Sequence, residues 1–266
     1  MPYKKGAGGD PQKYNPSDGK YDESKKNPYR QNETYENILK MDAEKYRLSF
    51  GDKYTLTRQE SIFLAKKKWD ENVYCGMRME NRAVTFPQTK TILDGMSVSG
   101  VHISDVEAIL NMRDAWRFLL KTIDDEISLE YACKLHSFIG RNEALEWGVL
   151  RKGTVSVGDY TPALPDAEAI QKELAGILES GSSVTSKALD IFLMFSRGQF
   201  FWDGNKRTAL TMANKLLVQN GAGMLIIPEG KMEDFNTRLI DFYKTGNGEN
   251  LKLFLYENAI VGIDYE

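Results

Sequence analysis

The residues best suited to chemistry lie in one short stretch, Gln199 to Leu210 (QFFWDGNKRTAL). Gly204 permits a sharp turn there, and the free N–H groups of the helix that follows, with its dipole, form an anion site. Lys206 and Arg207 add positive charge, and Asp203 suits a divalent cation that bridges the phosphates of a nucleotide. The spacing is not that of a Walker A loop. The pattern predicts a phosphate-binding loop, and a capped helix with surface charges is the alternative.

Apolar residues at helical spacing surround this loop and predict an all-α fold. The patterns Thr57–Glu60 and Ser104–Glu107 are capping boxes that predict two long helices, and Pro87 predicts a short helix that ends at Gly95. Further helices are predicted over residues 33–43, 128–139, 166–178, 186–195 and 205–221, and twice between 232 and 260.

Residues 149–162 interrupt this helical pattern. Short extended pieces flank Lys152–Gly153 and Gly158–Asp159, which predicts a small β-hairpin. Because a lone hairpin is marginally stable in water, we expect it either to pack against the helices or to offer an edge to another chain.

The cysteines and histidines give no sign of a metal site. Cys75 and Cys133 form neither a disulfide framework nor a metal box, and we interpret them as reduced thiols. His136 falls on a partly apolar helix face and is interpreted as a core residue, whereas His102 is given no role.

Composition limits the partners. The formal net charge of −3 implies no strong field, so duplex nucleic acid is not expected. Residues 1–32 hold four of the eight prolines and are predicted to form a flexible N-terminal arm. No apolar run approaches the roughly 18 residues that span a bilayer, and no signal peptide is evident. We expect no membrane partner and a cytoplasmic location.

The stretch QFFWDGNKRTAL resembles the signature of the Fic/Doc (Fido) family, HxFx[DE]GN[GK]RxxR, at Phe201, Asp203, Gly204, Asn205 and Arg207. Residues 92–119 resemble the helical segment that precedes the core of that family, and residues 148–162 resemble its flap. The resemblance covers roughly residues 57–262. It implies a mostly helical domain that moves AMP, or less often another phosphate-containing group, from a nucleotide to a hydroxyl of a target protein.

The resemblance also implies roles for single residues. Asp203 would hold Mg²⁺, and the phosphates of ATP or another nucleotide would meet Gly204, Asn205, Lys206 and Arg207. The flap, about residues 153–161, would align a target segment by β-augmentation. Its candidate residues are Thr154, Val155, Val157 and Tyr160. A homodimer is a further possible assembly.

The chain departs from the family pattern at three positions of the motif. Gln199 stands at the position of the catalytic His, and an amide cannot accept the proton of the target hydroxyl. Losing a general base typically costs a factor of about 10²–10⁴. Lys206 replaces the usual Gly and is similar to the variant in Doc toxins, which phosphorylate. Leu210 replaces the last Arg, so one phosphate contact is lost.

Residues 76–81 resemble the inhibitory motif [ST]xxxE[GN] of many family members. Glu80 and Asn81 match, whereas Gly76 replaces Ser or Thr. Since Leu210 removes the usual partner of this Glu, Glu80 could pair with Arg207 instead. The alternative is an ordinary exposed glutamate.

Three regions are therefore predicted: the arm (1–32), a helical region with a candidate inhibitory helix (33–95) and a Fic core domain (96–266). The resemblance favours a nucleotidyltransferase with reduced or altered activity. Lys206 favours, as one alternative, a phosphotransferase similar to Doc. Gln199 and Leu210 favour, as another, a non-catalytic nucleotide-binding regulatory module.

Overall fold

The structure, a computed structural model, describes residues 48–265 of the chain. The predicted arm over residues 1–32 and the predicted helix over 33–43 lie outside the described residues. The described residues all belong to one compact unit.

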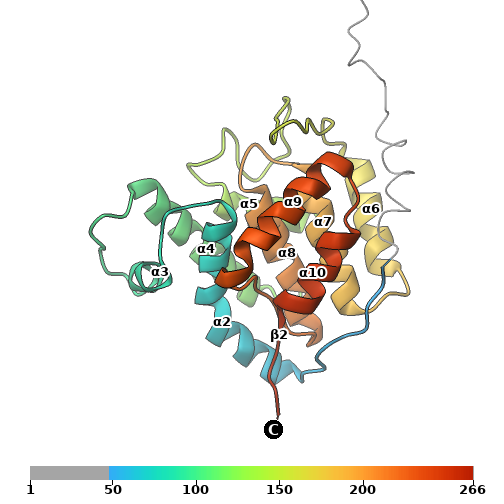
Figure 1. Ribbon diagram of the computed structural model, residues 1–266, viewed down its shortest axis with the longest axis horizontal. Coiled ribbons are helices and arrows are strands. Elements are labelled where there is room, and N and C mark those ends of the chain that lie inside the picture. The colour runs from blue at the N-terminus through green and yellow to red at the C-terminus, as the bar shows by residue number, and fades with distance from the viewer. Residues whose placement is uncertain (1–47, 266) are drawn as a thin grey trace, which may run out of the picture. The chain divides into compact units, whose positions relative to one another are not determined.

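This unit is mostly helical, as predicted (Figure 1). The α-helices of the described residues are α2 (Arg58–Met79), α3 (Phe86–Leu93), α4 (Ile103–Lys121), α5 (Leu129–Ile139), α6 (Ala167–Glu179), α7 (Val184–Gly198), α8 (Asn205–Asn220), α9 (Met232–Thr245) and α10 (Glu249–Ala259). A 3₁₀ turn, η1 (Glu229–Lys231), precedes α9. Two short strands, β1 (Met224–Leu225) and β2 (Ile260–Val261), complete the fold.

Local sequence signals account for most helix starts. Thr57 forms the predicted capping box: its side chain accepts from the N–H of Glu60, whose carboxylate accepts from the N–H of Thr57. The box predicted at Ser104 is wrong, because α4 already begins at Ile103 with an N-cap at His102 that makes no side-chain bond. Ser104 is therefore inside the first turn rather than before it.

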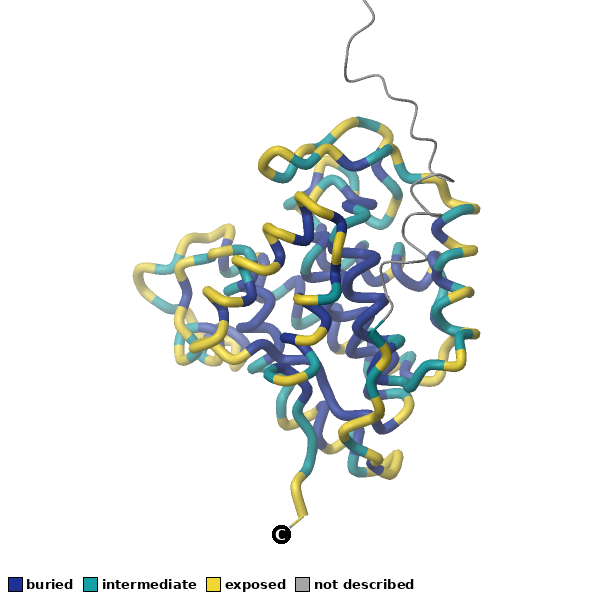
Figure 2. Tube along the Cα trace, turned by 45° about the vertical axis from the view of Figure 1, so that its right-hand side comes forward, coloured by how far each residue is buried: buried dark blue, intermediate teal, exposed yellow. Residues whose placement is uncertain are grey.

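Helix α8 lies at the centre of the unit. It packs against α7, α2, α5 and α4, and nearly every residue from Asn205 to Val218 is buried. In Figure 2 the buried segments gather in the interior, with exposed residues on the outer turns. A helix that is buried on all sides must be central. The candidate phosphate loop directly before α8 is thus held by the core of the domain.

The β structure differs in place from the prediction. The two-stranded antiparallel sheet pairs Met224 with Val261 and Leu225 with Ile260. Within residues 149–162 the only ladder contact of the described chain is one antiparallel bridge, in which Val157 and Tyr160 exchange backbone hydrogen bonds across Gly158–Asp159. The hairpin is thus formed at its tip but not along its legs. One reason is that the N–H of Arg151 donates to Phe200 instead.

Among the described residues, no helix combines the length and the apolar character that crossing a bilayer requires.

Candidate functional site

The loop that joins α7 to α8 has left-handed backbone at both ends. Gln199, the C-cap of α7, has φ +46°, and Gly204, the N-cap of α8, has φ +72°. The turn at Gly204 was predicted. It forms no side-chain cap, so the N–H groups of the first turn of α8 keep the anion-binding character expected of a helix start.

Asn205 closes this loop on itself. Its Oδ1 accepts from the N–H of Phe201 at 2.9 Å, and its Nδ2 donates to the carbonyl of Phe201 at 2.9 Å and to Oε1 of Gln199 at 3.1 Å. The side chain is buried and its amide is committed to the loop. The side chain of Asn205 therefore shapes the loop and is already bonded within it.

Gln199, which the resemblance predicts at the position of a proton acceptor, is held in the structure by hydrogen bonds of its amide. Its Nε2 donates to the carbonyl of Ser196 at 2.6 Å, and its Oε1 accepts from Asn205. The residue is 8% exposed. These two hydrogen bonds hold the amide in place, and an amide is not basic enough to act as a general base.

His136 supports the loop from below, a role that the sequence did not reveal. The predicted burial is confirmed, and the ring stacks on Phe201 with centroids 3.9 Å apart. The N–H of Gly148 donates to Nδ1 at 3.0 Å, so Nε2 carries the proton and donates to the carbonyl of Asp203 at 2.9 Å. Burial lowers the pKa of His136 to about 4, while the hydrogen bond to Asp203 opposes that shift. The ring is a neutral, fixed spacer.

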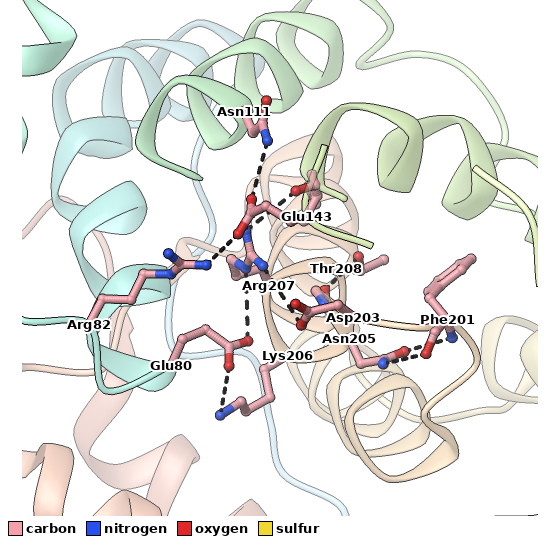
Figure 3. A network of polar contacts seen from close by, with 12 residues as sticks. Glu80, Arg82, Asn111, Glu143, Phe201, Asp203, Asn205, Lys206, Arg207 and Thr208 are labelled. Carbon is pink, nitrogen blue, oxygen red and sulfur yellow. Dashed lines mark hydrogen bonds and ion pairs between the residues drawn. The ribbon is translucent and has the colours of Figure 1, made fainter. Parts of the chain in front are cut away.

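Arg207 is completely buried beneath the loop, at 0% side-chain exposure, among three carboxylates (Figure 3). Its Nη1 contacts Glu143 at 2.8 Å, its Nε lies 3.8 Å from Glu80, and its Nη2 lies 4.0 Å from Asp203. Burial alone would lower the pKa of Arg207, but Glu143 and Glu80 outweigh it and raise the pKa above its usual value. Nε and Nη2 have no hydrogen-bond acceptor among the described residues. Two buried donors are therefore without a close acceptor.

The pair suggested between Glu80 and Arg207 exists, and Lys206 joins it. Nζ of Lys206 lies 3.0 Å from Glu80 and donates to the carbonyl of Met79 at 2.6 Å. Glu80 follows the last residue of α2, so the end of that helix faces both cations of the motif. Both cations are engaged with the protein itself.

The sequence missed Glu143 and its supports. Glu143 lies between Arg207 and Arg82, which binds it on the other side and also contacts Asp105 at 2.9 Å (Figure 3). Asn111 donates to Glu143 from α4 at 3.2 Å. These residues have ordinary types and no motif spacing, so only the fold brings them together.

The two remaining departures from the motif are accommodated by packing. Leu210 is buried in the core. A Cβ atom added to Gly76 would lie 3.1 Å from Met112, 3.6 Å from the stem of Arg207 and 3.9 Å from Leu210. The space that a larger residue at 76 would need is thus already taken.

A cavity of about 520 Å³ adjoins the loop, a size typical of small-molecule sites. It lies between the tip of the flap (Val157–Asp159), helix α9 and Lys206, and Tyr243 lines it. Tyr160 stacks on Tyr243 at 6.2 Å between ring centroids. A larger groove, of about 1060 Å³, lies between α5, α6 and residues 148–152, but no residue from 199 to 210 lines it.

Asp203 is the candidate metal ligand. Its side chain is 52% exposed, and one carboxylate oxygen accepts from the N–H of Gly204 at 2.6 Å. Among the described residues no group of three or more His, Cys, Asp or Glu could form a protein-only metal site. A single carboxylate fits Mg²⁺, which commonly binds one or two carboxylates together with substrate phosphates.

The predicted flap residues lie beside this site with uneven exposure. Thr154 is exposed, whereas Val155, Val157 and Tyr160 are half-buried. Tyr160 is anchored, because the guanidinium of Arg197 lies 4.4 Å from the centre of its ring.

The chain is similar to known proteins of one family. Residues 126–217 match the model of the Fic/DOC family. The chain is 28% identical over 169 residues to "Protein adenylyltransferase fic-1" of Caenorhabditis elegans, which covers 59% of this chain and 33% of that protein. It is 26% identical over 200 residues to "Protein adenylyltransferase Fic" of Drosophila willistoni, covering 71% and 39%. The chain thus spans about a third to two fifths of the length of these curated relatives.

Solved structures show the same fold. Fic-1 from C. elegans superposes with a TM-score of 0.61 at 20% identity, covering 83% of this chain and 66% of that one. A Fic family protein from Desulfovibrio desulfuricans G20 superposes with a TM-score of 0.59 at 16% identity, covering 73% and 62%. The chain contains a Fic/DOC family domain.

Proposed function

We propose that this Fic-domain chain transfers AMP from ATP to a hydroxyl of a target protein, with low basal turnover. The observation that carries the proposal is the buried guanidinium of Arg207 below the start of α8. Its Nε and Nη2 lack a hydrogen-bond acceptor among the described residues. Buried donors without acceptors are costly, and a phosphate at the helix N-terminus would supply the missing oxygens.

The neighbouring cavity offers a seat for the nucleoside. Its wall combines the apolar side chains Leu239 and Ile240 and the ring of Tyr243 with the polar groups of Asn81 and Asn236. Apolar walls suit the ring of a nucleobase, and the amides can form hydrogen bonds with the polar atoms at its edge. Because Lys206 lines the same cavity, the phosphates would point from there toward the first turn of α8.

Asp203 would hold Mg²⁺ beside those phosphates. The ion would neutralise charge on the phosphates and orient the α-phosphate for attack. The hydrogen bond from His136 to the carbonyl of Asp203 keeps the loop in place while the carboxylate remains open to solvent.

The flap would present the target. Thr154 and its neighbours have no ladder partner among the described residues, which supports docking of a target segment by main-chain hydrogen bonds. The target hydroxyl would then attack the α-phosphate and pyrophosphate would leave.

Gln199 supports low turnover. In the absence of a base at this position, the hydroxyl keeps its proton until it attacks, which typically costs about 10²–10⁴ in rate. Glu80 supports a second restraint, because it occupies Lys206 and Arg207 at the place that phosphates would need. We therefore assign Glu80 an inhibitory role.

The test is label transfer by the full chain with Mg²⁺ and a cell lysate. Wild type, Gln199→His and Gln199→Leu are compared, each with α-labelled and γ-labelled ATP. We expect label from α-labelled ATP only, with Gln199→His faster than wild type by about 10²–10⁴. Gln199→Leu, which has neither an amide nor a base, controls for packing. Absence of transfer by both wild type and Gln199→His would refute the proposal.

Two other results would identify the alternatives. Transfer from γ-labelled ATP would assign a phosphotransferase, which Lys206 favours. ATP binding in a calorimeter without transfer by any variant would assign a non-catalytic regulatory module, which the hydrogen-bonded amide of Gln199 favours.

A further inference from the structure

Arg151 is a buried cation whose partners are all backbone carbonyls. The residue is 2% exposed. Its Nε donates to Gln199 at 2.6 Å, and its Nη1 donates to Gly153 at 2.6 Å. Its Nη2 donates to Ala163 and, at 3.4 Å, to Pro162. No acidic side chain among the described residues pairs with this guanidinium.

These carbonyls belong to three different segments. Gly153 begins the flap, Pro162 and Ala163 follow its end, and Gln199 begins the motif loop. One side chain thus closes the base of the flap and ties it to the first residue of the motif. The backbone N–H of Arg151 adds a fifth hydrogen bond by donating to the carbonyl of Phe200 at 3.0 Å.

A second, independent contact joins the same segments. A Cβ atom added to Gly153 would lie 2.5 Å from the ring of Trp202, so Gly153 packs directly on the motif loop. The flap base is therefore fixed in two ways, by the hydrogen bonds of Arg151 and by the packing of Gly153 on Trp202, and the second does not involve Arg151.

Hydrogen bonds to carbonyls in several directions at once require the guanidinium of an arginine. A planar guanidinium carries five N–H donors in a fixed fork and can reach carbonyls in several directions at once, whereas a lysine presents a compact point charge. Burying a charge without a counter-ion costs free energy. Neutral donors could make a purely structural contact at a lower desolvation cost.

We propose that Arg151 is a positioning residue: it holds the base of the flap at a fixed distance from Gln199 and so sets where a target hydroxyl meets the α-phosphate. This inference rests on the proposed function. The position of the flap would determine the position of a target strand that pairs with it. A misplacement of the target hydroxyl by about 1 Å can lower the rate by a factor on the order of 10².

The experiment separates two reactions of one site in the Gln199→His background. The first is labelling of lysate proteins from α-labelled ATP, which needs the flap. The second is hydrolysis of ATP to AMP and pyrophosphate, in which water replaces the target and the flap is not needed. We expect Arg151→Met to lower labelling by about 10² while hydrolysis and the Kd for ATP stay unchanged. Arg151→Lys should restore little, and Arg58→Met, at an exposed ion pair, should change neither reaction.

Two further measurements keep the test decisive if Arg151→Met folds poorly. Gly153→Ala disturbs the same base through Trp202 and should also lower labelling more than hydrolysis. Amide hydrogen exchange of residues 153–161 should accelerate in Arg151→Lys, while α4 stays protected. Equal loss of both reactions, or unchanged labelling with Arg151→Lys and Gly153→Ala, would overturn the inference. Absence of labelling with Arg151 intact would instead refute the proposed function.

Discussion

Among the described residues, two buried arginines lie beside the same loop, and their surroundings differ in kind. Arg207 lies among the carboxylates of Glu143, Glu80 and Asp203, which outweigh burial and raise its pKa. Arg151 lies among carbonyls, and burial lowers its pKa. A carboxylate can be exchanged for another anion such as phosphate, whereas a backbone carbonyl cannot be released without moving the chain. The carboxylates around Arg207 therefore suit exchange with a ligand. The carbonyls around Arg151 suit a fixed structural contact.

Removing Glu143 should give the largest effect on stability. Glu143→Ala removes the carboxylate nearest to both Arg207 and Arg82. Breaking a buried ion pair costs about 3–5 kcal/mol. Urea denaturation of this variant and of Glu130→Ala, an exposed control on the neighbouring helix, checks the prediction. Equal midpoints for the two variants would show that Glu80 and Asp203 suffice for Arg207.

Arg151→Met should cost less, because it removes a cation that has no counter-ion. Each carbonyl that stays buried without a donor costs about 1–3 kcal/mol of folding free energy. Removing the unpaired buried charge offsets part of this total cost, so we expect a net loss of stability of about 2–3 kcal/mol. The same urea series measures it. A loss greater than that of Glu143→Ala would reverse the comparison between the two arginines.

Protonation of His136 should loosen the loop above Arg207. Its folded pKa of about 4 lies below the ordinary value of 6.5, because of burial and also because of the charge of Arg207. The unfolded chain therefore binds the proton more readily, so this contribution is complete above pH 6.5 and is lost as the pH falls toward 4. Between pH 7 and pH 5 we expect about 2 kcal/mol less stability from this group. In His136→Gln, the unfolding free energy should depend less on pH over this range, and an unchanged slope would contradict the assignment.

Glu80→Gln should have the smallest effect on stability and a clear one on binding. The Glu80–Lys206 contact is partly exposed, so its loss should cost no more than about 1 kcal/mol. If Glu80 competes with phosphate, as proposed, the Kd for ATP should fall about fivefold, equivalent to about 1 kcal/mol. Calorimetry measures the Kd, with Glu71→Gln on the same helix as control. A higher Kd would mean that Glu80 holds Lys206 and Arg207 in place for the ligand instead of competing with it.

The sequence predicted the parts of the fold and site that depend on neighbouring residues. The turn at Gly204, the capping box at Thr57 and the helical pattern all follow from local spacing, and the pairing of Glu80 with Arg207 followed from the loss of an arginine at 210. The flap was predicted as a hairpin, but among the described residues only the bridge between Val157 and Tyr160 forms, and the N–H of Arg151, just before the flap, donates to the distant residue Phe200.

The contacts that fix the loop from a distance could not be predicted. Glu143 lies 64 residues before Arg207, and nothing in its sequence surroundings marks it. The partners of Arg151 are carbonyls, which every residue has, so residue types contain no trace of them. His136 was recognised as buried, but its link to Asp203 depends on the packing of α5 against α8.

The half-exposed carboxylate of Asp203 has a consequence for the order in which ligands arrive. Among the described residues it has no neighbouring group of metal-binding side chains, so by itself it would retain a hydrated Mg²⁺ only weakly. Under the proposed function, the ion would enter as the counter-ion of ATP and leave with pyrophosphate, exchanging once per turnover. The rate should then follow the concentration of the MgATP complex and not that of free Mg²⁺.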